Sequence, residues 1–210
     1  MEEEPNPIEK ASEELKFLLE RGYRKDSSLG FVGDHHQLDA KARNRLMREV
    51  YSGQEISDTE SKLTPIEELE GKDLAVDGFN VIITVEAALF RGEAFVCQDG
   101  IMRDNTMAFS NYKITDRTLA AADRVIGVLA KYRPRQAVWV FDSGISGSGK
   151  IAEHVRRKMA DAGLKGESTT SPDADGRLLG LNMATATSDT VLIHKLESIV
   201  DLPQAALAES

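Results

Sequence analysis

The sequence contains little cysteine, no long apolar run and no excess of basic side chains. Its single cysteine, Cys97, has no partner for an internal disulfide, which fits a reducing compartment such as the cytoplasm. No segment approaches the roughly 20 consecutive apolar residues of a membrane-spanning helix, and the acidic start MEEEPNPIEK is not typical of a secretory signal. We therefore expect a cytoplasmic protein without a membrane anchor, in which Cys97 is a half-buried strand residue rather than a reactive thiol.

Acidic residues outnumber basic ones. The chain has 35 Asp and Glu against 26 Lys and Arg, which gives a formal net charge of −9. This balance argues against a protein that coats DNA non-specifically. It leaves room for an enzyme that acts on nucleic acid, because a site that holds cations on carboxylates is acidic and basic groups can lie elsewhere.

The sequence changes character along its length. Residues 1–55 predict a small helical domain, in which a short helical turn opens at Asp26 or Ser27 and a longer helix begins after the N-cap Asp39. Residues 56–72 are polar and predict a linker, in which TPIEELEG (64–71) can add one helical turn. Residues 73–203 predict an α/β domain, and residues 204–210 form a tail.

Short apolar strands alternate with helical segments in the α/β domain. The stretches DLAVD (73–77), QAVWVFD (136–142) and GEST (166–169) predict strands, and Asp99-Gly100 predicts a hairpin with a type I′ turn. The alternation predicts a mostly parallel, Rossmann-like sheet with helices on both faces. The fold class is therefore α/β, preceded by a small all-α domain.

Three of the apolar strands end in an aspartate. These are Asp77, Asp142 and Asp189, and the loop SPDAD adds Asp173 and Asp175. In a parallel open sheet, ligands bind outside the carboxyl ends of the strands, and hard divalent cations relieve the repulsion between clustered carboxylates. We therefore expect a Mg²⁺ or Mn²⁺ site suited to phosphodiester hydrolysis. An aspartate after a strand is also often a helix N-cap, which is the competing interpretation for each one taken alone.

The stretch GISGSGK (144–150) has the glycine and lysine spacing of a nucleotide-binding P-loop. That motif needs Ser or Thr after its lysine, to bind magnesium, and here Ile151 follows Lys150. We favour a glycine-rich exit from the strand, beside which Lys150 can still meet a phosphate near the helix N-terminus.

The stretches LAVDGFNVI (74–82), VWVFDS (138–143) and ATSDT (186–190) resemble the acidic strand ends of PIN-like nuclease domains, especially the flap-endonuclease-like and NYN branches. The whole chain also resembles an uncharacterised archaeal family that joins an N-terminal helical domain to such a part. The PIN-like resemblance implies that Asp77, Asp142 and Asp189 are metal ligands and catalytic residues, and that Asn80 orients Asp77 or a water.

PIN-like enzymes usually carry a further carboxylate on a helix or loop. Four residues are candidates, of which we favour the first two: Asp173, Asp175, Asp104 and Glu86. Asp104 can instead form a local ion pair with Arg103. Phosphate or nucleic-acid contacts are expected from six residues: Ser143, Lys150, Ser188, Arg43, Arg45 and Arg48.

Two histidines stand side by side in GDHHQLD. His35 and His36 could bind a metal with Asp34, but adjacent side chains seldom face one ion, and an exposed turn is the preferred interpretation. The sequence as a whole predicts a metal-dependent nuclease, with RNA favoured as substrate through the resemblance. The alternatives are a catalytically weak PIN-like RNA-binding adaptor and, in second place, a P-loop nucleotide-binding protein.

Overall fold

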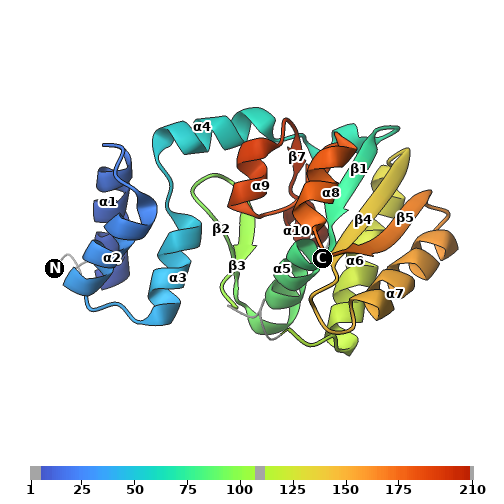
Figure 1. The fold of residues 1–210 in the computed structure, drawn as a ribbon, viewed down its shortest axis with the longest axis horizontal. Coiled ribbons are helices and arrows are strands. Elements are labelled where there is room, and N and C mark those ends of the chain that lie inside the picture. Colours follow the sequence, from blue (N-terminus) through green and yellow to red (C-terminus); the bar gives the residue numbers. More distant parts are fainter. Residues whose placement is uncertain (1–5, 107–111, 209–210) are drawn as a thin grey trace.

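The computed structural model describes residues 6–106 and 112–208 and places a helical N-terminal region beside a larger α/β unit (Figure 1). Four helices make up the N-terminal region: α1 (Pro7–Leu19), α2 (Lys25–His35), α3 (Ala40–Glu49) and α4 (Gly53–Lys62). The first three share a small core that includes Leu15, Val32 and Leu46. Helix α4 crosses from this core to the α/β unit, where it packs on α9 (Thr190–Lys195).

The centre of the α/β unit is a five-stranded parallel sheet with the strand order β5-β4-β1-β6-β7. Its strands are β1 (Asp73–Asp77), β4 (Gln136–Asp142), β5 (Gly166–Ser171), β6 (Ala184–Ala186) and β7 (Ile199–Val200). From β1 the chain adds β4 and then β5 on one side of the sheet, and β6 and then β7 on the other side. The crevice where a doubly wound sheet binds ligands is therefore expected beside β1, at the carboxyl ends of the strands.

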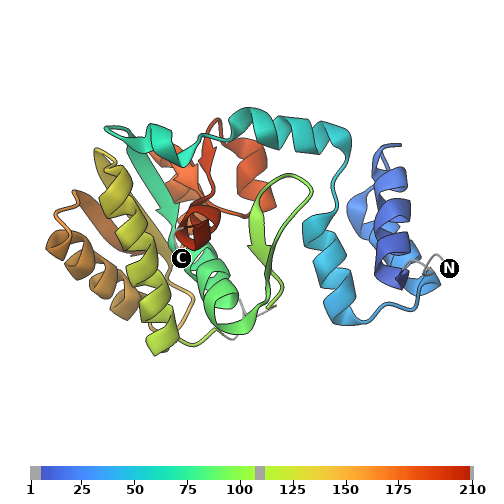
Figure 2. The same cartoon turned by 180° about the vertical axis from the view of Figure 1, so that it is seen from behind.

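Helices cover both faces of the sheet, as the sequence predicted. The side chains of Val76, Trp139 and Phe141 face a core that is completed by α5, α6, α7 and α10, whereas Ala75 and Val140 face α8 and α9. Figure 2 shows α5, α6 and α10 on the side turned away in Figure 1. The remaining elements are η1 (Ile66–Leu69), α5 (Gly78–Arg91), α6 (Asp116–Tyr132), α7 (Ser148–Asp161), α8 (Ala174–Leu181) and α10 (Leu202–Ala208).

A separate antiparallel hairpin joins β2 (Ala94–Val96) to β3 (Met102–Asp104). The predicted hairpin is confirmed, but the predicted type I′ turn is wrong. Such a turn needs positive φ at both central residues, and here Gly100 has a φ of 79° while Asp99 does not lie in that region. The Asp99 side chain instead turns inward to Arg103.

Two N-terminal segments are more helical than the sequence analysis expected. Helix α2 has 11 residues and begins at Lys25, not at a cap formed by Asp26 or Ser27. The segment expected as a polar linker contains the second half of α4, whereas η1 lies in TPIEELEG, where one helical turn was expected. A capping box between Ser52 and Glu55 opens α4 and satisfies backbone N–H groups in its first turn. The predicted N-cap at Asp39 is confirmed.

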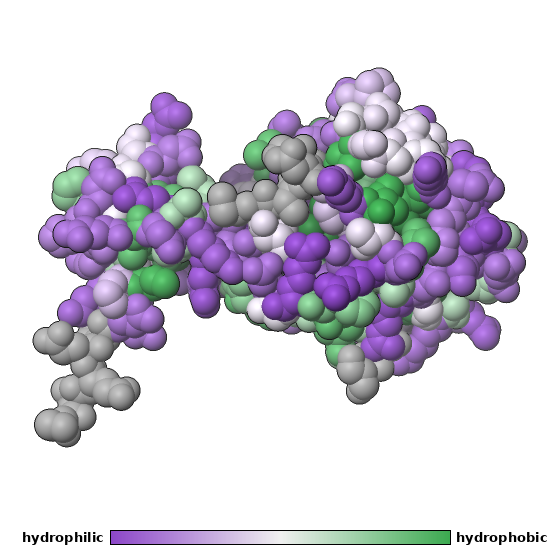
Figure 3. Space-filling view, turned by 90° about the horizontal axis from the view of Figure 1, so that it is seen from below, coloured by the Kyte–Doolittle hydropathy of each residue, from purple (hydrophilic) through white to green (hydrophobic). Residues whose placement is uncertain are grey.

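The surface seen from below is mostly hydrophilic, and apolar side chains gather there in small separate areas (Figure 3). No helix in the described parts of the chain is long and apolar enough to cross a membrane.

Candidate functional site

The three strand-end aspartates lie at one edge of the sheet. Asp77 is the last residue of β1, Asp142 the last of β4, and Asp189 follows β6 as the N-cap of α9. Strand β1 pairs in parallel with both β4 and β6. The three carboxyl groups therefore point out of the same end of three neighbouring strands.

These residues line one pocket of about 730 Å³ that lies between the sheet edge and the N-terminal helices. Its acidic wall consists of Asp77, Asp142, Asp173, Asp175 and Asp189. Asn80, Ser188 and Thr190 add polar groups. Four side chains come from the helical region: Lys25, Asn44, Met47 and Arg48. Both parts of the chain thus contribute to the same site.

Asp77 is the most perturbed of these acids. The pKa of its carboxyl group is raised to about 7, chiefly by burial. The Thr187 hydroxyl, which donates to Asp77 Oδ2 at 2.9 Å, lowers the pKa, whereas the negative charges of Asp189 and Asp175 raise it further. The pKa of Asp175 is also raised, by burial first and then by Asp189 and Asp173. The pocket therefore concentrates negative charge that a cation would relieve.

Three of the aspartates also hold backbone N–H groups. Oδ1 of Asp189 accepts from Leu192 N at 2.9 Å, Oδ1 of Asp173 accepts from Gly176 N at 2.9 Å, and Oδ1 of Asp142 accepts from Gly144 N at 2.7 Å. Asp173 and Asp189 are thus the N-caps of α8 and α9, whereas the bond of Asp142 closes a turn after β4. Asp77, by contrast, begins α5 without a side-chain cap bond.

Asn80 positions the loop that carries Asp189. Its Oδ1 accepts from the backbone N–H of Ser188 at 3.2 Å and also from the Ser188 hydroxyl. On the other side of this loop, Nε of Arg103 donates to the Ser188 carbonyl at 2.8 Å. Asn80 thus acts on the Asp189 loop, and Ser188 is fixed by Asn80.

Of the four candidates for a further carboxylate, the structure brings Asp173 and Asp175 to the pocket. Glu86 is buried and accepts hydrogen bonds from Tyr112 and Thr118, so it is a core residue. Asp104 accepts from Thr106 and lies 3.7 Å from Arg48. The expected ion pair between Asp104 and Arg103 is wrong, because Arg103 makes a bidentate pair with Asp99, at 2.7 Å for each bond.

The glycine-rich turn does not reach the pocket. Ser143 and Lys150 are exposed and do not line it. Ile151, at the position where a P-loop has its magnesium ligand, is fully buried in the core. Gly147 has a φ of 87° and lets the chain enter α7. The turn therefore connects β4 to α7, as the glycine content suggested.

One of the three candidate arginines on α3 lines the pocket, and that is Arg48. Arg43 binds Asp34 at 2.8 Å and the Leu38 carbonyl at 2.9 Å, so it joins α2 to α3. Arg45 pairs with Glu49 at 2.8 Å. The expected phosphate-binding face of α3 is therefore reduced to Arg48.

Lys25 is a pocket residue that was not predicted from the sequence. Its Nζ is buried, has no hydrogen-bond partner among the described residues, and lies 3.6 Å from the centre of the Tyr51 ring. Burial lowers the pKa of Lys25 to about 8. The Tyr51 hydroxyl lies 3.0 Å from Thr190 Oγ1, next to Asp189. No local pattern identifies Lys25, because its place depends on how the helical region packs against the sheet.

Comparison with known proteins identifies two family models and a relative. Residues 7–62 match the family described as "Protein of unknown function (DUF434)", and residues 66–205 match "Domain of unknown function (DUF5616)". The chain is 34% identical over 202 residues to "Uncharacterized protein MJ0935" of Methanocaldococcus jannaschii, an alignment that covers 95% of this chain and 96% of that protein. Since one match spans most of the chain and the relative aligns along nearly its whole length, this protein belongs to the DUF5616 family and carries an N-terminal DUF434 region.

Proposed function

We propose that the protein is a divalent-metal-dependent nuclease of the PIN-like type that hydrolyses phosphodiester bonds, with RNA as the preferred substrate. The observation that carries the proposal is the convergence of five aspartates, among them Asp77 with its raised pKa, on one pocket beside β1. Such a set of hard oxygen ligands suits Mg²⁺ or Mn²⁺. The preference for RNA rests on the resemblance to PIN-like domains, and the cytoplasmic location rests on the single cysteine.

The pocket aspartates suit a cation that keeps part of its hydration shell. Among the described residues, the group of three His, Cys, Asp or Glu side chains close enough to share an ion lies elsewhere, at Glu14, His35 and His36. The aspartates therefore do not form a ready-made cage. This suits Mg²⁺, which usually keeps several waters and binds through one or two carboxylates and the substrate phosphate. The candidate direct ligands include Asp77, Asp175 and Asp189, because the negative charges of Asp189 and Asp175 already act on the Asp77 carboxyl group.

A bound cation would orient the attacking water and stabilise negative charge on the phosphate oxygens. The residues of the chain do the rest. Asn80 and Arg103 fix the loop of Asp189 from two sides. Lys25 and Arg48 stand on the helical wall, where a nucleic-acid strand in the pocket would place its phosphates. The substrate would lie between the sheet edge and the N-terminal helices.

The second candidate function is binding of nucleic acid without cleavage. It is favoured by the side-chain bonds of Asp142, Asp173 and Asp189 to backbone N–H groups, which give each a structural role. A P-loop function is disfavoured by the burial of Ile151.

The test is cleavage of labelled RNA and DNA strands in Mg²⁺ or Mn²⁺, with EDTA as a blank. We expect wild-type protein to cleave RNA, and we expect Asp77→Asn and Asp142→Asn to lose the activity while they stay folded. Asp161→Asn, at the exposed end of α7, is the matched control and should keep it. Equal cleavage by the two pocket variants would indicate a contaminating nuclease. Retained RNA binding without any cleavage by the wild type would favour the binding function.

A further inference from the structure

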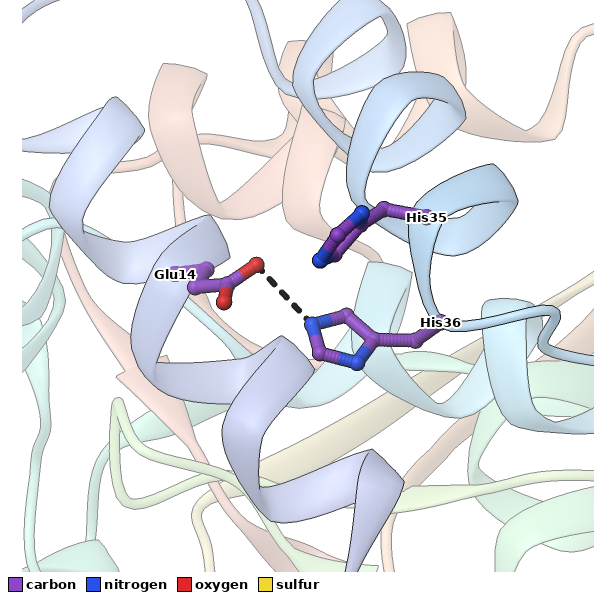
Figure 4. A group of neighbouring side chains, drawn as sticks. All are labelled: Glu14, His35 and His36. Atoms are coloured by element: carbon purple, nitrogen blue, oxygen red, sulfur yellow. Dashed lines mark hydrogen bonds and ion pairs between the residues drawn. The ribbon is translucent and has the colours of Figure 1, made fainter.

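A second group of potential metal ligands lies in the helical region, far along the chain from the aspartates. Glu14 on α1 and the pair His35 and His36 at the end of α2 point toward one another (Figure 4). His36 Nε2 lies 2.9 Å from Glu14 Oε2, and one donor atom from each of the three side chains lies within 4.8 Å of the others. Two imidazoles and one carboxylate thus face a common point between two helices.

The end of α2 explains how adjacent histidines converge. His35 is the last helical residue, His36 has a φ of −89° and a ψ of 5°, and Gln37 has a φ of 52°, so the chain leaves the helix at this point. The two rings are 4.8 Å apart and nearly perpendicular. The expected exposed turn is wrong for His36, whose side chain is only 12% exposed.

Asp34 does not take part, although it is the nearest carboxylate in the sequence. Its Oδ1 accepts from Arg43 at 2.8 Å, on the side of α2 that faces α3. The carboxylate that meets the histidines is Glu14, which belongs to α1, the helix before α2. A sequence motif therefore does not reveal this group.

We propose that Glu14, His35 and His36 bind a divalent transition-metal cation of the zinc class, with a water in the fourth position. Imidazole nitrogen is a ligand that suits Zn²⁺, Ni²⁺ and Cu²⁺, whereas Mg²⁺ prefers oxygen. Metal–ligand bonds of about 2.0–2.2 Å place tetrahedral ligands roughly 3.3 Å apart. The observed separation of 2.9 Å between His36 and Glu14 and the upper limit of 4.8 Å for the three donor atoms bracket that value. The ion would join α1 to α2 over the core of Leu15 and Val32.

A simple ion pair between Glu14 and His36 would also hold α1 against α2. It would not use His35, whose exposed ring points to the same place (Figure 4). His35 therefore distinguishes the two roles, and its removal leaves the pair between Glu14 and His36 in place.

The experiment is titration of the full-length protein with Zn²⁺, and with Co²⁺ followed by its visible absorption, in millimolar Mg²⁺. Excess Mg²⁺ occupies oxygen ligands but competes weakly for imidazole. We expect one equivalent to bind to the wild type. His35→Gln and Glu14→Gln should each weaken binding by at least about tenfold, because even the partners of metal ligands contribute about 10- to 100-fold.

Two matched controls separate this site from the rest of the chain. Glu13→Gln removes the neighbouring carboxylate on α1, and His194→Gln removes a histidine on α9. Both should bind Zn²⁺ as the wild type does, and Asp77→Asn should do so too. Because Asp77→Asn alters the proposed nuclease site and leaves the three ligands intact, its Zn²⁺ binding tests the zinc site separately from the nuclease activity. Circular dichroism confirms that each variant is folded.

A second readout is thermal unfolding. A cation that binds only the folded chain raises the melting temperature, so Zn²⁺ should raise it for the wild type and for Glu13→Gln but much less for His35→Gln. The proposal is overturned if wild-type protein binds no Zn²⁺ in Mg²⁺, or if His35→Gln and Glu14→Gln bind it as tightly as the wild type. The side-chain group would then be an ion pair that packs α1 on α2.

Discussion

Burial of Asp77 in the folded chain disfavours the charged form of its carboxyl group. Its pKa is raised from an ordinary value of 3.8 to about 7, first by burial. Between these two pH values the folded chain keeps a proton that the unfolded chain releases. Stability of the cation-free protein therefore falls as pH rises through this window, and the full loss is reached above pH 7.

Asp77→Asn should abolish that pH dependence. We expect the variant to be more stable than the wild type by roughly 1–3 kcal/mol at pH 8, where the wild type keeps a poorly solvated charge, and about equally stable near pH 4. Denaturant unfolding at both pH values measures this. Mg²⁺ should narrow the gap at pH 8 by binding the wild type, and Asp161→Asn should show none of these effects. A pH-independent difference would mean that the Asp77 carboxyl group titrates normally.

The position of Lys25 leads to a prediction about RNA affinity. Its ammonium group is buried in the pocket wall against Tyr51 and has a pKa lowered to about 8 by burial. Lys25→Met keeps much of the apolar stem and removes the charge, so we expect RNA affinity to fall about tenfold, or 1.4 kcal/mol. The slope of affinity against salt should also become shallower, because fewer counterions are released.

The pH dependence of binding identifies Lys25 more directly. As pH rises from 7 to 9, wild-type protein loses the Lys25 proton and should bind RNA more weakly, whereas Lys25→Met should bind equally across this range. Filter binding or fluorescence anisotropy at fixed salt measures both. Lys10→Met on the exposed side of α1 is the control. A wild-type pH profile that persists in Lys25→Met would place the titrating group elsewhere.

At the scale of elements, sequence reasoning succeeded where a local pattern decides the structure. Short apolar runs ending at Asp77 and Asp142 predicted β1 and β4, and the parallel arrangement then placed their acids at one edge. It failed at α4, whose polar composition suggested a linker although the capping box of Ser52 and Glu55 was visible in the sequence. Lys25 could not be predicted, because a contact between distant elements leaves no periodic signal.

The loop between β6 and α9 is held by Asn80, which provides the acceptor for both Ser188 donors. Asn80→Ala leaves these donors without that partner, so we expect a stability loss of about 1–3 kcal/mol. Because Asp189 then loses its fixed position, cleavage should fall at least about tenfold, since small displacements of reacting groups are costly.

Asn6→Ala is the matched control for this loop. Asn6 caps α1, so its loss should cost about 1 kcal/mol without touching the pocket. Comparing kcat with the free energy of unfolding in both variants separates positioning from general destabilisation. Equal activity losses in the two variants would contradict a positioning role for Asn80.

At the scale of the whole molecule, the helical region and the α/β unit meet around the pocket. Several contacts join them. Among these, Lys62 Nζ donates to the Ile193 carbonyl at 2.8 Å, the Tyr51 hydroxyl lies 3.0 Å from Thr190 Oγ1, and Gln98 N donates to the Glu49 carbonyl at 3.0 Å. The core of α1–α3 is small and separate from those of the sheet. A core of that size gives little stability by itself, so the helical region depends on these contacts.

Hydrogen exchange tests this dependence. In a Tyr51→Phe, Lys62→Met variant we expect the amides of α1–α3 to exchange faster, because local opening of this region no longer has to break the two contacts to α9. Amides of β1 and β4 should keep their protection, since the sheet packs on its own helices. Lys72→Met, which removes a surface ion pair with Glu68, is the control and should change neither region. Loss of protection in both regions would show that the chain opens as one cooperative unit, whereas unchanged exchange in α1–α3 would show that this core is stable without its neighbour.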